Sequence, residues 1–491
     1  MPSCGFGDER VREPAGSETR FDVAAVLRWP ALWRPLASIA RAGRKRPQRV
    51  ILGRSKEVAT ACPGTTLGSA EVADVRAHVE ETAGRAVSAA GRLRGLSDAA
   101  LDEVLRDVAG RLERRSDALL EANAADVAAG RAALSAAVLD RLRLDRSRIV
   151  QVADQIRSLA GLPGVEAIIG CSEIDGVRVE VRRIPVGAIG ANYEARANVT
   201  ADIASQLIKS RNAGVLRTGG AALRTAIAMI DLAVGPALQA GGVSPDAIGL
   251  VRSPAHEAAS ALVVLPRLLP LVILRGSGET TARLGREAAA HGVRTLAHAE
   301  GGGVMYVHPS ADRELALELV EQSLDRLGVC NRLNLLLIDA EIWDEWSQPA
   351  LDRIASLRLA SSLPPHEHPL GYEWALDPER AGTVTLSPVD GPKDAAETAN
   401  RETSGLAAAI VARDPSAAQE FIEHYQGTGA FWNQTTRLLD GYRLFRAPET
   451  GINIDRVPGP RGPVTYRDLH LRQIVVTPTT TGERLPDQSD P

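Results

Sequence analysis

A chain of 491 residues is too long for one small module and predicts two or three domains that share a large core. Apolar residues make up 44% and charged residues 24%, both close to the average of globular proteins. Lys plus Arg number 57 against 61 for Asp plus Glu, a net charge of −4, so no global basic field exists to hold nucleic acid or an anionic membrane, and a small-molecule partner is favoured.

The four cysteines, Cys4, Cys62, Cys171 and Cys330, are widely scattered. They form no CxxC motif and no histidine lies at zinc spacing, so we expect neither a disulfide framework nor a metal site. This usage indicates a reducing cytoplasm. No apolar run approaches the roughly 20 residues that span a bilayer. The longest, 261–274, is broken by two prolines and an arginine and predicts a helix end, a loop and a buried strand.

The N-terminal stretch 1–70 mixes Gly, Pro, Arg and isolated apolar clusters without a sustained period, so we expect a mostly disordered extension. Its basic run RAGRKRPQR at 41–49 leaves a transit peptide, a nuclear tag or an RNA-binding tag as alternatives. Five acidic residues among the first 22 argue against the transit peptide.

Residues 70–160 predict helices, because apolar residues recur at spacings of three and four, and Ser97 followed by Asp98 indicates a helix start. At 177–193 an alternating segment becomes wholly apolar, as a strand or hairpin does when it leads into a buried strand. Further short apolar strands with turn residues follow, in NAGVLRTGG, DAIGLVRS, LPLVILRGSG and GVRTLAHAEGG. Their alternation with helical stretches predicts a parallel, doubly wound sheet.

A second α/β pattern begins near residue 304, with strands at VMYVHP, LNLLLID, TVTLSP and AAAIVAR and helices between them. The segment VTYRDLHLRQIVVTP alternates again and could pair with an edge strand, which could belong to another subunit. The tail 479–491 is expected to be disordered.

The candidate nucleophile is Cys330, within LGVCNRLNLLLID. A lone cysteine in an apolar segment is usually a core residue, but here Gly328 permits close backbone approach and Asn331 offers polar contacts just before a buried strand. A thiol placed where a turn meets a helix N-terminus has a lowered pKa and is the better nucleophile.

From about residue 78 to about residue 476 the chain resembles the γ-glutamyl phosphate reductases, a branch of the aldehyde dehydrogenase superfamily. The resemblance rests on PVGAIGANYEARANVT, LVILRGSG, HAEGGGVMYVHPSAD, GVCN, WNQTTRLLDGYRLF and ETGI, in this order. The first string is highly specific, and GVCN about 130 residues later makes a chance match implausible.

The resemblance implies an α/β, aldehyde dehydrogenase-like fold with two doubly wound domains. A nucleotide-binding domain with a helical N-terminal part and a β-hairpin oligomerisation arm would occupy 71–303, and a catalytic domain with the cysteine 304–445. The segment 446–478 would return to the core and the arm. A homo-oligomer is implied, and a glutamate 5-kinase is a possible partner.

The implied reaction is NADPH-dependent reduction of L-glutamate 5-phosphate to L-glutamate 5-semialdehyde and phosphate, on the route to proline. Cys330 takes the nucleophile's place and would expel phosphate to leave a thioester, which is electrophilic enough to accept hydride. The backbone amide of Cys330 and the side chain of Asn198 are the candidate donors to the oxyanion.

For the cofactor, Arg217 in GVLRTGG stands where the superfamily places a basic residue beside the adenosine ribose, which favours a 2′-phosphate and hence NADPH. A surface arginine at a strand end is the alternative. Gly276, Ser277 and Gly278 follow a strand and open a helix, so their backbone N–H groups could face a pyrophosphate.

Glu300 lies near the place where hydrolytic aldehyde dehydrogenases keep a water-activating glutamate. An acyl phosphate reductase needs no such base, so Glu300 would position the nicotinamide or hydrate a turn. Glu373 in GYEW could bond the nicotinamide ribose or be an ordinary loop glutamate. His366 and His368 lack acidic or cysteine companions, and we expect them to be solvated and to bind no metal.

Several segments depart from the family pattern: Ala197 replaces the usual proline, the lead-in to Cys330 is altered, and NRETSGLAAAI lacks the usual Gly, His and Ser cluster. These changes fall where a substrate would be held, for which Arg196, Arg437 and Asn331 are the candidates. They leave two alternatives open, a divergent paralogue that acts on another acyl phosphate or aldehyde, and a catalytically silent scaffold.

Overall fold

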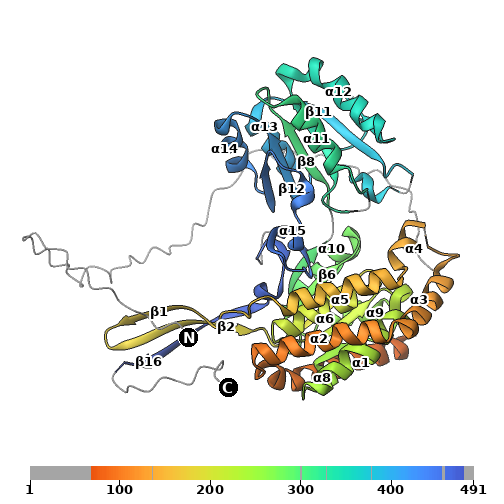
Figure 1. Ribbon diagram of the computed structural model, residues 1–491, viewed down its shortest axis with the longest axis vertical. Coiled ribbons are helices and arrows are strands. Elements are labelled where there is room, and N and C mark those ends of the chain that lie inside the picture. Colours follow the sequence, from red (N-terminus) through yellow and green to blue (C-terminus); the bar gives the residue numbers. More distant parts are fainter. Residues whose placement is uncertain are drawn as a thin grey trace, which may run out of the picture. The chain divides into compact units, whose positions relative to one another are not determined.

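The structure, a computed structural model, describes residues 68–134, 136–298, 301–327, 329–377, 379–455 and 459–479 (Figure 1). The extension predicted at 1–70 lies outside the described residues up to 67, and the tail predicted at 479–491 lies outside them from 480 onward.

Helices dominate residues 69–160, as the periodicity predicts. They are α1 (Ser69–Arg94), α2 (Asp98–Arg114), α3 (Ser116–Gly130), α4 (Ala136–Leu142) and α5 (Arg146–Ala160). The predicted helix start is confirmed, because the Ser97 hydroxyl accepts a hydrogen bond from Ala100 N at 3.3 Å and so caps α2.

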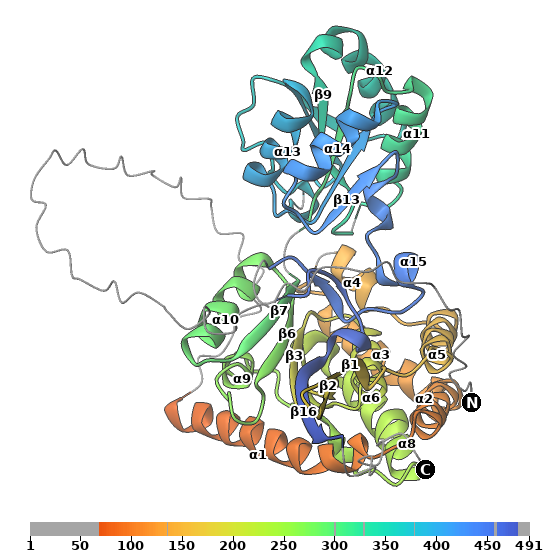
Figure 2. The ribbon, with the colours of Figure 1, turned by 90° about the vertical axis from the view of Figure 1, so that its left-hand side faces the viewer.

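The first sheet has five parallel strands in the order β5-β4-β3-β6-β7. These are β3 (Ala188–Tyr193), β4 (Ala213–Thr218), β5 (Ile248–Leu250), β6 (Leu271–Arg275) and β7 (Arg294–His298). One face packs on α2, α5 and α6 (Val199–Lys209), and the other on α1, α9 (Glu257–Leu262) and α10 (Gly278–Ala290) (Figure 2). The strand order reverses between β3 and β6, which confirms the doubly wound arrangement.

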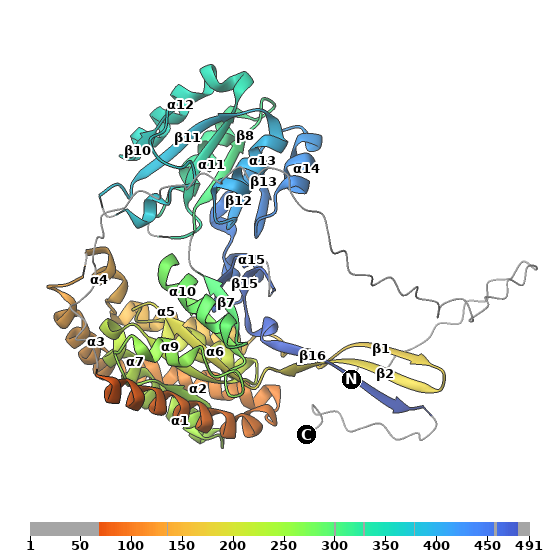
Figure 3. The same ribbon diagram turned by 180° about the vertical axis from the view of Figure 1, so that it is seen from behind.

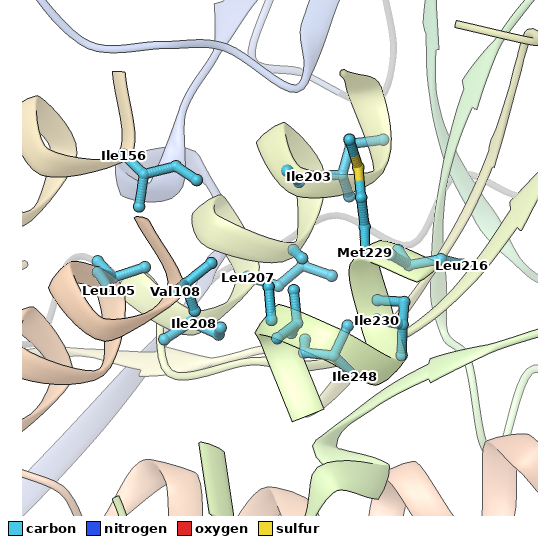
Figure 4. Close-up of a cluster of buried hydrophobic side chains, with 14 of the residues drawn as sticks. Leu105, Val108, Ile156, Ile203, Leu207, Ile208, Leu216, Met229, Ile230 and Ile248 are labelled. Carbon is cyan, nitrogen blue, oxygen red and sulfur yellow. The ribbon is translucent and has the colours of Figure 1, made fainter. Parts of the chain in front are cut away.

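The core on the first of these faces is aliphatic (Figure 4). It contains Leu105, Val108, Ile156, Ile203, Leu207, Ile208, Leu216, Met229, Ile230 and Ile248. Part of it comes from 220–240, a helical run made of α7 (Leu223–Met229), a π-helical turn (Ile230–Val234) and α8 (Gly235–Ala240). This run, which was not predicted from the sequence, is long and apolar enough to cross a membrane. However, 56% of its most apolar window is buried inside the protein.

The second sheet is also parallel, in the order β10-β11-β9-β8-β12-β13. Its strands are β8 (Gly303–Val307), β9 (Leu333–Asp339), β10 (Ala360–Ser362), β11 (Thr383–Val389), β12 (Ala407–Val411) and β13 (Gly429–Trp432). Four of them are the predicted strands, while the short edge strands β10 and β13 were missed. Helices α11 (Arg313–Ser323) and α12 (Trp343–Ser356) cover one face, and α13 (Gly391–Glu402) and α14 (Pro415–His424) the other (Figure 3).

The predicted hairpin arm has a third strand. β1 (Ile168–Ile174), β2 (Val177–Pro185) and β16 (His470–Pro478) form an antiparallel sheet in the order β1-β2-β16 (Figure 1). The alternating segment near the C-terminus therefore pairs with β2 of its own chain, from His470 opposite Pro185 to Pro478 opposite Val177. Two short antiparallel strands, β14 (Gly451–Asn453) and β15 (Gly462–Val464), lie in the C-terminal segment that leads to β16.

We expect Lys209→Ala to lower the free energy of unfolding by about 3 kcal/mol, because it breaks a buried ion pair. Lys209 is 1% exposed, and its Nζ lies 2.5 Å from Asp102 Oδ1 and donates to Leu162 O at 2.7 Å. The measurement is urea unfolding. The control is Lys393→Ala, since Lys393 is exposed and its ion pair with Glu397 is long, at 4.0 Å, and therefore weak. Equal losses in the two variants would contradict the prediction.

Candidate active site

Cys330 lies in the turn between α11 and β9. The backbone entering β8 runs directly beside it, and Gly302 N donates to Cys330 O at 2.6 Å. A Cβ at Gly301 would lie 2.2 Å from Cys330 O, so this approach requires glycine. Gly328, to which the sequence analysis gave that role, lies outside the described residues.

Two predicted substrate residues, Asn331 and Arg437, are brought together beside the cysteine. The Asn331 amide donates to Leu439 O at 3.0 Å and its oxygen accepts from Arg437 Nη1. Arg437 also donates from Nε to Asp325 Oδ1 at 2.6 Å. Both side chains are buried and already bonded to protein groups, so a contact with substrate would be added to these bonds.

A half-buried charge cluster lies at the carboxyl ends of β3 and β6. Glu194 Oε1 is 3.3 Å from Arg196 Nε and 3.3 Å from Arg275 Nη2. Burial alone would raise the pKa of Glu194, but Arg275 and Arg196 hold it below its ordinary value. Ligands of doubly wound sheets bind where the strand order reverses, which is the position of this cluster.

These groups line one cavity of about 540 Å³. Its polar lining includes Arg141, Arg196, Arg275, Arg326, Arg437, Arg443, Glu194, Glu373, Asp440, Glu449, Gly276, Ser277, His298, Cys330 and Asn331. Six arginines against four carboxylates make the cavity suited to an anionic small molecule.

The expected lowering of the Cys330 pKa is wrong for this structure. Burial raises the pKa of the thiol to about 12, and Glu449 and Glu373 add to the rise, while Arg275 and Arg196 oppose it. The physical reason is that the turn leads into a buried strand and not into a helix of its own, so burial decides the direction of the shift.

Glu449 is a site residue that was not predicted from the sequence. Its Oε2 accepts a hydrogen bond from Gly441 N, and burial raises its pKa to about 7, with Asp440 contributing. Arg275 and His298 were missed as well, although each ends a strand of the doubly wound sheet. The rule that ligands bind beyond the carboxyl ends of such strands could have found both.

Glu373 is held beside the cysteine turn by Asn334. Asn334 Nδ2 donates to Tyr372 O at 2.8 Å, and Asn334 Oδ1 accepts from Trp374 N at 3.2 Å. The side chain therefore binds the backbone on both sides of Glu373. A Cβ at Gly302, where φ is +95°, would lie 2.7 Å from Glu373 Oε2. The carboxylate therefore lies directly over the glycine backbone that bonds to Cys330.

The predicted pyrophosphate turn has the expected geometry. Gly276 adopts a φ of +152°, and Ser277 caps the thirteen-residue helix α10, which starts at Gly278. Gly276 and Ser277 line the cavity of Cys330, whereas Gly278 lines a neighbouring groove along α10.

Arg217 ends up buried, at 6% exposure, and is not a surface arginine. It donates to Ala255 O at 3.0 Å and to Asn192 Oδ1 at 3.3 Å. It does not line the cavity of Cys330. Asn198 does not line it either, and its amide donates to Asp202 Oδ2 at 2.7 Å.

Glu300 lies outside the described residues. His366 and His368 are half-buried, so they are solvated only in part. Their ring centres are 5.3 Å apart, and His368 packs edge-on against Trp374 at 4.8 Å. Within the described part of the chain, no three His, Cys, Asp or Glu residues form a metal-binding group.

Comparison with known proteins identifies the family to which the chain belongs. The model of the aldehyde dehydrogenase family matches residues 51–369, more than half of the chain. The chain belongs to this family. Within the family it is 34% identical to a γ-glutamyl phosphate reductase of Novosphingobium aromaticivorans over 411 residues, which cover 82% of this chain and 95% of the relative. It is 32% identical to one of a Caulobacter species, over 72% of this chain and 85% of that relative. This aldehyde dehydrogenase family member is therefore an aldehyde-group oxidoreductase of the γ-glutamyl phosphate reductase branch.

Solved structures agree with this family fold. The γ-glutamyl phosphate reductase of Thermotoga maritima superposes with a TM-score of 0.75 at 25% identity, over 82% of this chain and 98% of that one. An acetylating aldehyde dehydrogenase of Geobacillus thermoglucosidasius, at 14% identity and a TM-score of 0.61, over 85% of this chain and 99% of that one, shares the fold alone. The predicted aldehyde dehydrogenase-like fold is confirmed.

We expect Glu449→Gln to accelerate alkylation of Cys330 by iodoacetamide at pH 9 by about three- to tenfold, because removal of a neighbouring negative charge lowers the pKa of the thiol. In the wild-type protein, burial keeps the thiol mostly un-ionised at that pH. Peptide mass spectrometry separates Cys330 from the exposed Cys171. Glu423→Gln, on the surface of α14, should leave the rate unchanged. A slower reaction in Glu449→Gln would contradict the expectation.

Proposed function

We propose that this chain reduces L-glutamate 5-phosphate to L-glutamate 5-semialdehyde and phosphate, with NADPH as the hydride donor and a thioester on Cys330. The observation that carries the proposal is that Cys330 opens onto a cavity lined by six arginines, in a chain of the γ-glutamyl phosphate reductase branch. A substrate with a carboxylate and a phosphate supplies the negative charges that such a lining attracts.

The first step is removal of the thiol proton. Of the charged groups around Cys330, Glu449 has the largest effect on its pKa, and its own pKa of about 7 suits a group that accepts and returns a proton. Transfer leaves a thiolate and a neutral carboxylic acid. Arg196 and Arg275, which favour the thiolate, also attract the anionic substrate into position.

The thiolate then attacks the acyl carbon. As the sulfur–carbon bond forms, the carbonyl electron pair moves onto oxygen, and its return breaks the bond to phosphate, which leaves with its electron pair. The backbone N–H of Cys330 remains the proposed donor to that oxygen, whereas Asn198, expected as a second donor, bonds Asp202 and lies outside the cavity lining. When bound, the reduced nicotinamide supplies the hydride that converts the thioester into the aldehyde. Cys330 leaves as a thiolate and can take back the proton held by Glu449.

The residues present fit an NADP nucleotide. Arg217 is a buried cation whose partners are neutral oxygens, its Nε has no hydrogen-bond partner, and within the described part of the chain no carboxylate lies within 4.0 Å of it. Such a cation would take the 2′-phosphate. The turn of Gly276 and Ser277, at the start of α10, would take the pyrophosphate. Glu373 would hold the nicotinamide ribose.

Assembly into a homo-oligomer through the arm is part of the proposal. The large apolar side chains Ile174, Leu471, Ile474 and Val476 are each more than half exposed on β1 and β16. Exposed apolar side chains on the two edge strands of a sheet are costly in water and suit burial against a second copy. A kinase that makes the labile acyl phosphate, such as a glutamate 5-kinase, would be the partner upstream.

Cys330→Ala should abolish turnover, because Cys330 is the one thiol that lines the cavity among the described residues. The assay runs backwards, following NADPH formation from L-glutamate 5-semialdehyde, NADP and phosphate. NADP affinity should stay within about twofold, because the substitution removes only the sulfur. Full activity in the variant would rule out the thioester. Wild-type protein that binds NADP but shows no phosphate-dependent turnover would point to a different acyl phosphate or aldehyde.

Arg217→Ala should weaken NADPH binding by about a hundredfold and NADH binding by less than about threefold, since only NADPH carries the 2′-phosphate. Fluorescence titration of the reduced nucleotides measures both affinities. Arg224→Ala is the matched control, because this arginine is exposed nearby and donates to Ala125 O. Equal losses for the two nucleotides in Arg217→Ala would remove the reason for preferring NADPH.

A further inference from the structure

His298 is a cavity group that the proposed mechanism does not use. It ends β7 and is the register partner of Arg275 on β6, so both side chains stand at the edge of the sheet where the charge cluster lies. It lines the cavity together with Cys330. A histidine in this place is either a structural anchor or a group that meets the substrate.

The hydrogen bonding of His298 fixes the position of its proton. Ile452 N donates to the ring Nδ1 at 2.7 Å, so Nδ1 is an acceptor and the neutral ring carries its proton on Nε2. Among the described residues, Nε2 makes no hydrogen bond. Burial lowers the pKa of His298 to about 4, and Arg275 adds to the lowering, so the ring stays neutral at physiological pH.

His298 and Cys330 belong to the same small region. Gly301, three residues after His298, lies against the cysteine, since a Cβ there would be 2.6 Å from Cys330 Cβ. Three residues of chain span at most about 11 Å. Arg275 and Arg196 both act on the His298 ring and on the Cys330 thiol, which places both groups around one pair of cations.

We propose that His298 donates its Nε2–H to the acyl oxygen of the substrate while Cys330 attacks. The carbonyl electron pair moves onto that oxygen as the sulfur–carbon bond forms, and the N–H stabilises the charge until phosphate leaves. His298 keeps its proton throughout. A neutral N–H fixed in place before the reaction needs no rearrangement when the charge develops. This inference rests on the proposed thioester function.

The two ring nitrogens can be tested separately. In His298→Asn the amide oxygen can replace Nδ1 as the acceptor for Ile452 N, but no donor reaches the position of Nε2. In His298→Gln the amide nitrogen can replace Nε2, but the acceptor for Ile452 N is lost. If His298 is only a structural anchor, His298→Asn should therefore keep the higher acylation rate. If His298 donates to the substrate, His298→Gln should keep the higher rate.

The measurement is the rate at which acetyl phosphate acylates Cys330, followed by intact-protein mass in the full chain without nucleotide. We expect His298→Asn to slow acylation by about a hundredfold, whereas His298→Gln retains about a tenth or more of the wild-type rate. Iodoacetamide alkylation of Cys330 and NADPH affinity should stay within about twofold in His298→Asn. The control is His308→Asn, since His308 bonds Ser310 and lies outside the cavity lining.

Each other outcome decides against the inference. Acylation of His298→Asn within about threefold of wild type would leave His298 as an anchor only. Equal losses of acylation and alkylation would mean that the ring acts on the thiol and not on the acyl oxygen. Wild-type protein that is never acylated at Cys330 would overturn the thioester function itself, which separates that failure from a failure of His298 alone.

Discussion

The candidate site depends on one half-buried contact, the pairing of Arg275 with Glu194. Arg275 ends β6 and Glu194 follows β3, the two strands between which the sheet order reverses. Arg275 also donates to Thr450 O at 2.9 Å, so one guanidinium joins both strands to the returning C-terminal segment. A buried ion pair contributes little net stability, but removal of one partner leaves an uncompensated charge, so the arrangement is strongly held once formed.

The same burial sets the chemistry of the neighbouring groups. It raises the pKa of Cys330 and of Glu449 and lowers the pKa of His298, so thiol and imidazole are both neutral at rest. The other charged side chains of the lining are the six arginines with Glu194, Glu373 and Asp440. An anionic substrate would enter a positively charged cavity in which the thiolate forms only when a proton acceptor is at hand. A resting thiol of this kind is protected from unwanted alkylation and oxidation.

The sequence predicted the architecture well and the site only in part. Hydrophobic periodicity located the long helices and the central strands, because burial on a regular element imposes a period on the residues. The three-residue strand β10 and the four-residue strand β13 carry too few residues for a period to show. Cys330 could be selected by its motif, but its pKa could not be predicted, because that depends on Glu449, which is 119 positions away in sequence.

The C-terminal segment 446–478 is held against the first domain mainly through its backbone, so its side chains can change without loss of these contacts. Arg275 bonds the carbonyl of Thr450, and His298 accepts from the amide of Ile452. Gln206 donates to Pro448 O at 2.8 Å, and Asn212 donates to Leu469 O at 2.8 Å. In each case a side chain of the first domain forms a hydrogen bond with the backbone of the segment. Backbone groups are the same whatever the side chain, so substitutions in 446–478 can preserve these contacts. Glu449 differs from these backbone contacts, because its carboxylate itself faces the cavity, and the proposed chemistry requires its identity.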